Sequence, residues 1–198
     1  MNVFTSEESM IEEGNSLVTA PKHGSKISRC MVVEGDVKSC EAIIIDGTVN
    51  GSVTCEDSVV VQKSGIVKGK IEAKAILLEG KVEGPLEASD IELGVSAKLT
   101  GYILANRARV AGMVDGDILS KESLEVCKGA EVVTYECVSP YIVVKGYIRG
   151  EVRANEMLDV RSGATIEGDV EVKELQTEGS GNIFGAISRF LDNVDADN

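Results

Sequence analysis

The sequence predicts an all-β fold in which the chain winds through about nine short coils of a parallel β-helix. Three observations lead to this prediction. One short phrase recurs through most of the chain, the residues inside each copy alternate between apolar and polar, and glycines return at fixed places. Hydrophobic residues make up 43% of the 198 residues and aromatic ones only 4%, so the core is built from Val, Ile, Leu and Ala.

The repeat places an apolar residue between two small ones. The phrase "DGTVNGSV" (46–53) returns as "EGKVEGPL" (79–86), "AGMVDGDI" (111–118) and "KGYIRGEV" (145–152). Rungs of a second type, such as "GIVKG" (65–69) and "ATIEG" (164–168), lie between these copies. The period is about 16.6 residues, and the long period is about twice that. The central residues are Val33, Val49, Val67, Val82, Leu99, Val114, Val132, Ile148 and Ile166.

Alternation within each copy predicts strands. Ile43, Ile45, Val49 and Val53 fall on one parity, and the residues between them are mostly polar. Such alternation indicates strands with one buried face. A unit of 16–17 residues is too short for a helix pair or a propeller blade, but it closes a coil of three short strands with glycines near the corners. About nine coils, each about 4.8 Å high, make a rod on the order of 40 Å long.

The two flanks lack the repeat. Residues 1–26 have no periodicity and are rich in Glu, Ser and Gly, which predicts a disordered leader before a β-helix domain over 27–174. Val3 and Phe4 in this leader offer a small apolar contact for a membrane surface.

The tail, residues 175–198, contains apolar residues at helical spacing, with Asn182 as the N-cap. We therefore expect a short amphipathic helix over 182–194 that either caps the last rung or binds a membrane or partner protein. The residues expected to make this contact are Ile183, Phe184, Ile187, Phe190 and Leu191.

Composition argues against several functions. The formal net charge of −13 disfavours nucleic acid as a partner, and no apolar stretch approaches 18 residues. One His, five Cys without a CxxC pair and no "GxxxxGK[ST]" loop give no catalytic, cofactor or metal site. Cys55 shares its slot with alanines and is expected to be a small core residue, and Cys137 to be similar. We expect a cytoplasmic protein that is not an enzyme.

The ends of the rod are the expected functional surfaces. A terminal coil leaves backbone N–H and C=O groups and an apolar core without a partner, so identical rods can stack end to end. The residues expected at these ends are Ile27, Val33 and Val37 on one side and Leu158, Ile166 and Val170 on the other.

The succession "IIIDGTVNGSVTCEDSVVVQKSGIVKGKIEAKAILLEGKVEGPLEASD" resembles the bactofilins, bacterial polymer-forming cytoskeletal proteins, and the similarity covers about residues 26–174. The resemblance implies a right-handed β-helix and non-polar filaments that assemble without nucleotide. It also implies largely disordered tails, of which the N-terminal one sometimes touches the membrane. The tail helix expected over 182–194 departs from this pattern.

Three functions follow from these expectations. The first is a self-assembling scaffold that forms filaments, recruits partner proteins and contacts the membrane peripherally. The second is a non-polymerising binding module capped by 182–194. The third, a β-helix enzyme, lacks catalytic groups in the sequence.

Overall fold

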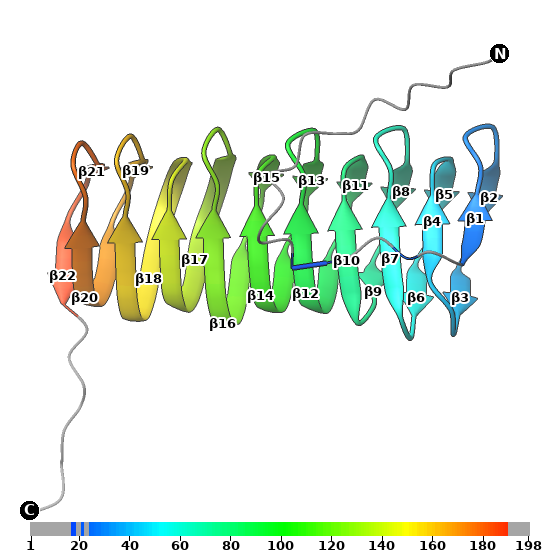
Figure 1. The fold of residues 1–198 in the computed structure, drawn as a ribbon, viewed down its shortest axis with the longest axis horizontal. Coiled ribbons are helices and arrows are strands. Elements are labelled where there is room, and N and C mark those ends of the chain that lie inside the picture. The colour runs from blue at the N-terminus through cyan, green and yellow to red at the C-terminus, as the bar shows by residue number, and fades with distance from the viewer. Residues whose placement is uncertain (1–16, 19–20, 22–23, 190–198) are drawn as a thin grey trace, which may run out of the picture.

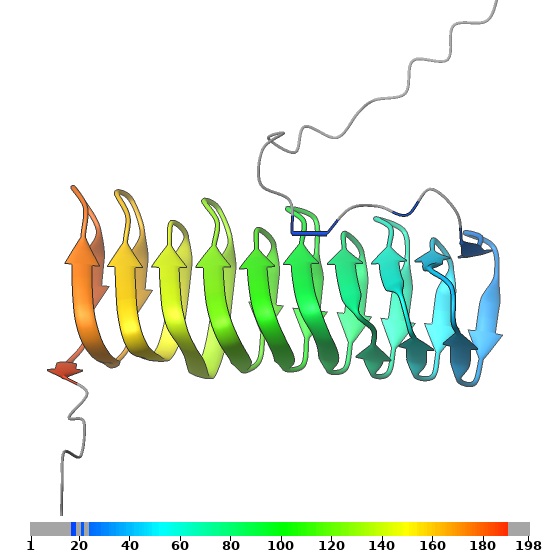
Figure 2. The ribbon, with the colours of Figure 1, turned by 60° about the horizontal axis from the view of Figure 1, so that its bottom comes forward.

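The computed structural model describes residues 17–18, 21 and 24–189 and confirms an all-β parallel β-helix. Successive coils lie side by side along a straight rod, with β1–β3 at one end and β22 at the other (Figures 1 and 2). All strand pairings are parallel, and each coil contributes strand segments to three faces, which we call faces A, B and C.

Each face contains ten strand segments. Face A consists of β1 (Ser25–Ile27), β4 (Ile43–Ile45), β7 (Ser58–Val61), β10 (Ala75–Leu78) and the final parts of β12 (Leu86–Leu93), β14 (Ile103–Val110), β16 (Ile118–Val126), β17 (Glu131–Val144), β18 (Tyr147–Val160) and β20 (Val170–Thr177). Face B consists of β2 (Val32–Glu34), β5 (Thr48–Asn50), β8 (Ile66–Lys68), β11 (Lys81–Glu83), β13 (Lys98–Thr100), β15 (Met113–Asp115), the starts of β17 and β18, β19 (Thr165–Glu167) and β21 (Asn182–Phe184). Face C consists of β3 (Val37–Ser39), β6 (Val53–Cys55), β9 (Ile71–Glu72), the starts of β12, β14, β16 and β20, the middles of β17 and β18, and β22 (Ile187–Arg189).

The core is a set of aliphatic columns, as the repeat predicts. The nine expected central residues pair in register along face B, from Val33 with Val49 to Ile148 with Ile166. The eight residues from Val49 onward are each at most 1% exposed. A fully buried Val, Leu or Ile contributes about 1.5–3 kcal/mol, so the stacked columns are the main source of stability.

Glycines occupy the corner between faces B and C because two constraints meet there. Gly84 has a φ of +147°, a conformation that side chains disfavour. A Cβ at this position would also lie 2.4 Å from the carbonyl oxygen of Gly69, the corner residue of the preceding coil. The same corner is a glycine in every coil except the seventh, where Thr134 stands.

The corner between faces A and B explains the alternation of rung types. Six coils turn here through four residues closed by a backbone hydrogen bond, such as Gln62–Gly65, where the N–H of Gly65 donates to Gln62 at 2.7 Å. The other four coils, the second, fourth, sixth and eighth, turn through two residues, such as Asp46 and Gly47. Long and short turns alternate through the first nine coils, and the tenth coil repeats the long form at Glu178–Gly181.

The seventh coil is the least regular one. Its register with the eighth coil shifts between Val133 and Glu136, where β17 carries one more residue than β18. Asp117 accepts the backbone N–H groups of Tyr135 and Glu136, both at 3.1 Å, and so satisfies the displaced backbone. Cys137 is fully buried in this coil and Cys55 is 4% exposed in the second, so both cysteines are core residues as expected.

The tail does not form the expected helix over its described part. Residues 182–184 and 187–189 are strands β21 and β22, which pair with β19 and β20. The helical spacing of Ile183, Phe184 and Ile187 was misleading, because residues spaced by four also occupy equivalent places on two strands separated by a corner. The described coils therefore run from Ser25 to Arg189, beyond the expected limits of 27 and 174.

The leader also differs from the expectation over its described residues. Ser25 and Lys26 belong to β1, and Leu17 and Val18 pack on the outside of face A against Val60 and Leu77. Figure 1 shows this short segment beside β10 and β12.

Candidate assembly surfaces at the two ends

The first coil forms an apolar end, as the sequence predicts. Ile27, Val33 and Val37 lie one on each face of this coil and point toward the core. Ile27 is 8% exposed, whereas Val33 and Val37 are half-buried because no described coil covers them on the outer side. Among the described strands β1, β2 and β3 pair only with β4, β5 and β6, so one edge of each is open.

The other end lies one coil further than the sequence analysis placed it. Leu158, Ile166 and Val170 were expected at the terminus, but each has a partner in the tenth coil and none is more than 1% exposed. The residues that cover them are Leu175, Ile183 and Ile187. Leu175 and Ile183 are half-buried and Ile187 is exposed, which is the exposure expected of an uncovered coil.

The residues expected to form a cap or a membrane contact fall in two groups. Ile183, Phe184 and Ile187 belong to the terminal coil, where Phe184 points outward and is 62% exposed. Phe190 and Leu191, and also Val3 and Phe4 of the leader, lie outside the described residues.

The tenth coil could have been found from the sequence. "GNIFG" (181–185) is the same Gly-x-apolar-x-Gly phrase that marks the other coils, and Ile183 lies 17 residues after Ile166. This spacing matches the period, so the phrase was a stronger signal than the helical spacing that competed with it.

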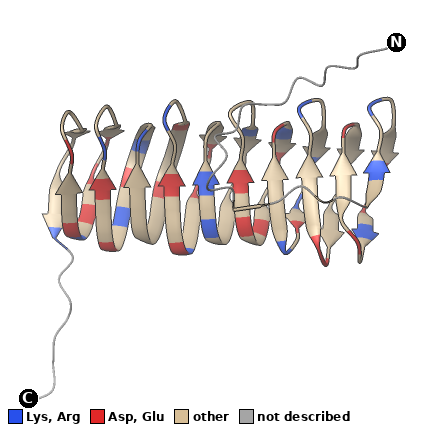
Figure 3. Cartoon of the chain, viewed as in Figure 1, with Lys and Arg blue, Asp and Glu red and all other residues tan. Residues whose placement is uncertain are grey.

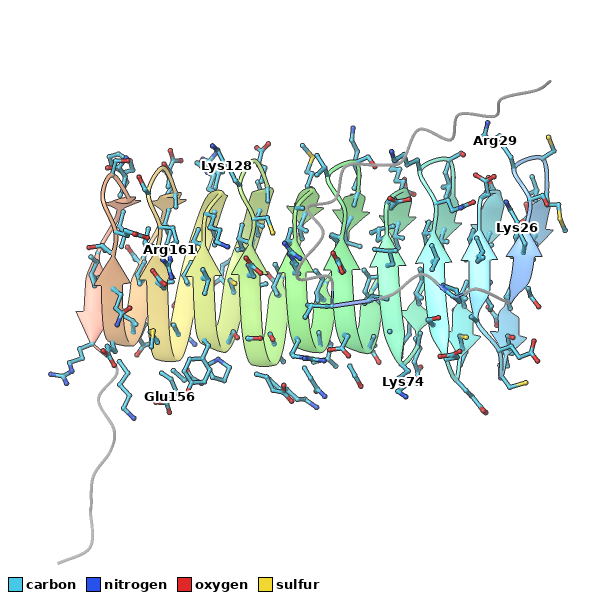
Figure 4. The ribbon with its side chains drawn as sticks, in the orientation of Figure 1. Lys26, Arg29, Lys74, Lys128, Glu156 and Arg161 are labelled. Atoms are coloured by element: carbon cyan, nitrogen blue, oxygen red, sulfur yellow. The ribbon has the colours of Figure 1, made fainter. Side chains whose placement is uncertain are left out.

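Basic residues lie at both ends of the rod. Arg189 occupies the face C position that is Val172 in the coil below and Ala154 in the coil before that, so a charged side chain stands at the end of a column of small residues. At the other end Lys26 and Arg29 both approach Asp46, at 4.0 and 3.8 Å, and extend into solvent (Figure 4). Surface pairs at these distances add little stability.

Charged groups along the sides pair between coils and do not converge on a site. Acidic and basic residues are spread over the length of the rod (Figure 3). Lys70 lies 2.7 Å from Glu87, and its hydrogen bond lowers the pKa of that carboxyl. Arg153 contacts Glu136, Glu151 and Glu171. Within the described part of the chain no group of three or more His, Cys, Asp or Glu could hold a metal ion.

Comparison with known proteins identifies relatives. The family model "Bactofilin: Polymer-forming cytoskeletal" matches residues 25–109 and again residues 104–188, so the two matches cover almost the whole described rod. The chain is 31% identical to bactofilin BacO of Myxococcus xanthus (strain DK1622) over 121 residues, which are 58% of this chain and 93% of BacO. It is 29% identical to bactofilin BacP of the same organism over 87 residues, 43% of this chain and 35% of BacP. No solved structure gives a significant match.

Proposed function

The chain belongs to the bactofilin family of polymer-forming cytoskeletal proteins, and on this premise we propose that it forms filaments by end-to-end stacking of its first and tenth coils. The filament needs no bound nucleotide in this proposal, because the contacts between copies repeat those between coils. The observation that carries it is that both terminal coils keep the apolar column geometry of the interior but have no described partner on their outer side.

Physical chemistry supports this role for the ends. An open strand edge presents unpaired N–H and C=O groups, and pairing it with a second copy satisfies them. Leu175, Ile183 and Ile187 would lose their remaining exposure in the same step, as would Val33 and Val37 at the other end. Because these are the same interactions that stabilise neighbouring coils, a joint between copies resembles the interior of the rod.

We propose the scaffold function rather than the capped binding module. The capped module required a helix over 182–194, and residues 182–189 instead contain the last two strands of the tenth coil, in which Phe184 and Ile187 are exposed. The scaffold acts in the cytoplasm, without an enzymatic activity, and recruits partner proteins along its sides.

Membrane contact is a separate part of the proposal. No helix among the described residues is long and apolar enough to cross a bilayer, so the contact would be peripheral and made by Val3 and Phe4 of the leader. Substituting both residues by Glu should abolish co-sedimentation with liposomes while leaving assembly unchanged.

Electron microscopy of the purified full chain, with and without liposomes, tests the whole proposal. We expect unbranched filaments in the absence of nucleotide, one rod wide, in which each subunit occupies about 48 Å of length, since it has ten coils of about 4.8 Å. Separate rods at all concentrations and salt conditions would refute end-to-end assembly.

A further inference from the structure

One row of outward-facing side chains on face A combines apolar and charged residues. Lys26, Ile44, Val60, Leu77 and Glu92 are in register on the first five coils. Three neighbouring apolar residues are therefore flanked by a cation on one side and a carboxylate on the other. Exposed apolar residues arranged contiguously are a feature of interaction sites rather than of ordinary surfaces.

The leader covers this row. Val18 is 5% exposed and packs with Val60 and Leu77, and Leu17 and Ile44 pack at the edge of the same cluster. Val143 stands in the same column three coils beyond Glu92 and does not belong to the cluster around Val18. Val143 is half-buried, whereas Val60 and Leu77 are buried.

The side chain of Glu92 binds the backbone of the leader. Its Oε2 accepts the N–H of Leu17 at 2.9 Å and the N–H of Val18 at 3.2 Å. Its Oε1 lies 3.9 Å from the guanidinium of Arg109, and the Glu92 residue is only 5% exposed. A buried carboxylate requires hydrogen-bond donors or a cation as partners. The row therefore ends in a carboxylate that accepts two consecutive backbone N–H groups of the leader.

The chain length fits an intramolecular contact. Six residues lie between Val18 and Ser25. The seven steps from one Cα atom to the next can span about 23–25 Å when the chain is extended. The distance from the first coil to the fifth is four coil spacings, about 19 Å. The leader can therefore reach Glu92 of its own rod.

The row is also complementary to itself. Val60 is its middle residue, with two positions on either side. A second rod placed antiparallel, related by a two-fold axis at Val60, would bring Lys26 opposite the partner's Glu92 and Ile44 opposite the partner's Leu77. Such a self-complementary patch is what a symmetric pair of copies requires.

We propose that the row from Lys26 to Glu92 is a lateral self-association site and that Leu17–Val18 is its intramolecular competitor. The same three apolar side chains cannot contact the leader and a second rod at once, so displacing the leader permits antiparallel pairing along face A. This proposal goes beyond end-to-end assembly and does not depend on it, because it concerns the sides of the rod and applies equally to single rods and to filaments. Figure 4 shows Lys26 on β1 at the start of this row.

Hydrogen exchange of the full chain tests the contact. The amides of Leu17 and Val18 should be protected independently of protein concentration, and Val18→Asp or Glu92→Gln should accelerate their exchange on the order of tenfold or more. Val95→Asp is the matched control, since Val95 is 83% exposed in a turn. Unprotected amides in the parent protein would overturn the proposal, and protection that rises with concentration would assign the leader to a neighbouring copy instead.

Cryo-electron microscopy tests the self-association. Val18→Asp should produce rods or filaments paired side by side in antiparallel register. Adding Val60→Asp should abolish the pairs. Lys26→Glu in the Val18→Asp background should weaken them, and Lys26→Glu combined with Glu92→Lys should restore them. Absence of lateral pairs in Val18→Asp, or their persistence after Val60→Asp, would overturn the proposal whatever the filaments do.

Discussion

Ile183 lies in register on Ile166, and this contact leaves Ile166 with no exposed surface. The two residues have the same type and the same place in the repeat, yet one is interior and the other faces the open end of the rod. Substitutions at the two positions should therefore have opposite consequences for folding and assembly.

We expect Ile183→Arg to leave the rod folded and to block stacking at the tenth coil. Ile166→Arg should destabilise the fold by about 3–5 kcal/mol, because it buries an unpaired charge between two coils. Thermal unfolding and analytical ultracentrifugation separate the two effects. Tyr135→Arg, at a side chain that is 83% exposed on the side of the rod, should change neither. Full-length filaments from Ile183→Arg would show that assembly uses another surface.

Arg189→Ala should strengthen assembly. Arg189 continues a column whose preceding members are Val172 and Ala154, so the substitution restores a small residue where the next coil would pack. The critical concentration measured by pelleting should fall, and its dependence on salt should weaken because a charge is removed from the joint. Lys173→Ala, at the corner that leads into the tenth coil and paired with Glu156 on the side of the rod, serves as the control. An unchanged critical concentration would exclude this end from the joint.

Gly84→Ala should destabilise the rod by about 3 kcal/mol, because the new methyl group meets the Gly69 carbonyl in an unfavourable backbone conformation. Gly129→Ala tests conformation alone. Gly129 has a φ of +83° with nothing within 4 Å of the added Cβ, so the expected loss is about 1 kcal/mol. Urea denaturation measures both. Equal losses would mean that contact between stacked corners is unimportant.

The five cysteines should differ in reactivity. Burial raises the pKa of the Cys137 thiol to about 12, and burial also raises the pKa of Cys55. At pH 8 both thiols stay protonated and enclosed, whereas Cys30 and Cys40 are exposed on the first coil. Iodoacetamide labelling followed by mass spectrometry should modify Cys30 and Cys40 first, and all five only in urea. Rapid native labelling of Cys137 would contradict its buried position.

Local pattern was enough to predict most of the rod. Nine central residues from Val33 to Ile166, the core role of Cys55 and the irregularity around Thr134 all follow from alternation and spacing, because each coil repeats the environment of the last. The end of the repeat was harder. Ile183 and Ile187 satisfy both a helical and a coil spacing, and the tenth coil breaks the alternation of turns, so the terminal residues were placed one coil too early.

The leader contact could not be predicted from local pattern. Leu17 and Val18 stand outside the repeat, and their hydrogen-bond acceptor, Glu92, is about 75 residues away. A row of three outward apolar residues at Ile44, Val60 and Leu77 was the available signal. It becomes visible only when the coils are aligned, since these residues are far apart in the chain.

The consecutive long turns of the ninth and tenth coils give a filament a directional marker. Along the edge between faces A and B, long turns recur at every second coil, about every 9.6 Å. A head-to-tail joint would place the ninth, tenth and first coils in succession and produce three long turns in a row on one edge. A joint between two first coils or between two tenth coils would not bring the edges between faces A and B into line. A density map that resolves the turns would therefore distinguish polar from non-polar filaments and locate every subunit boundary.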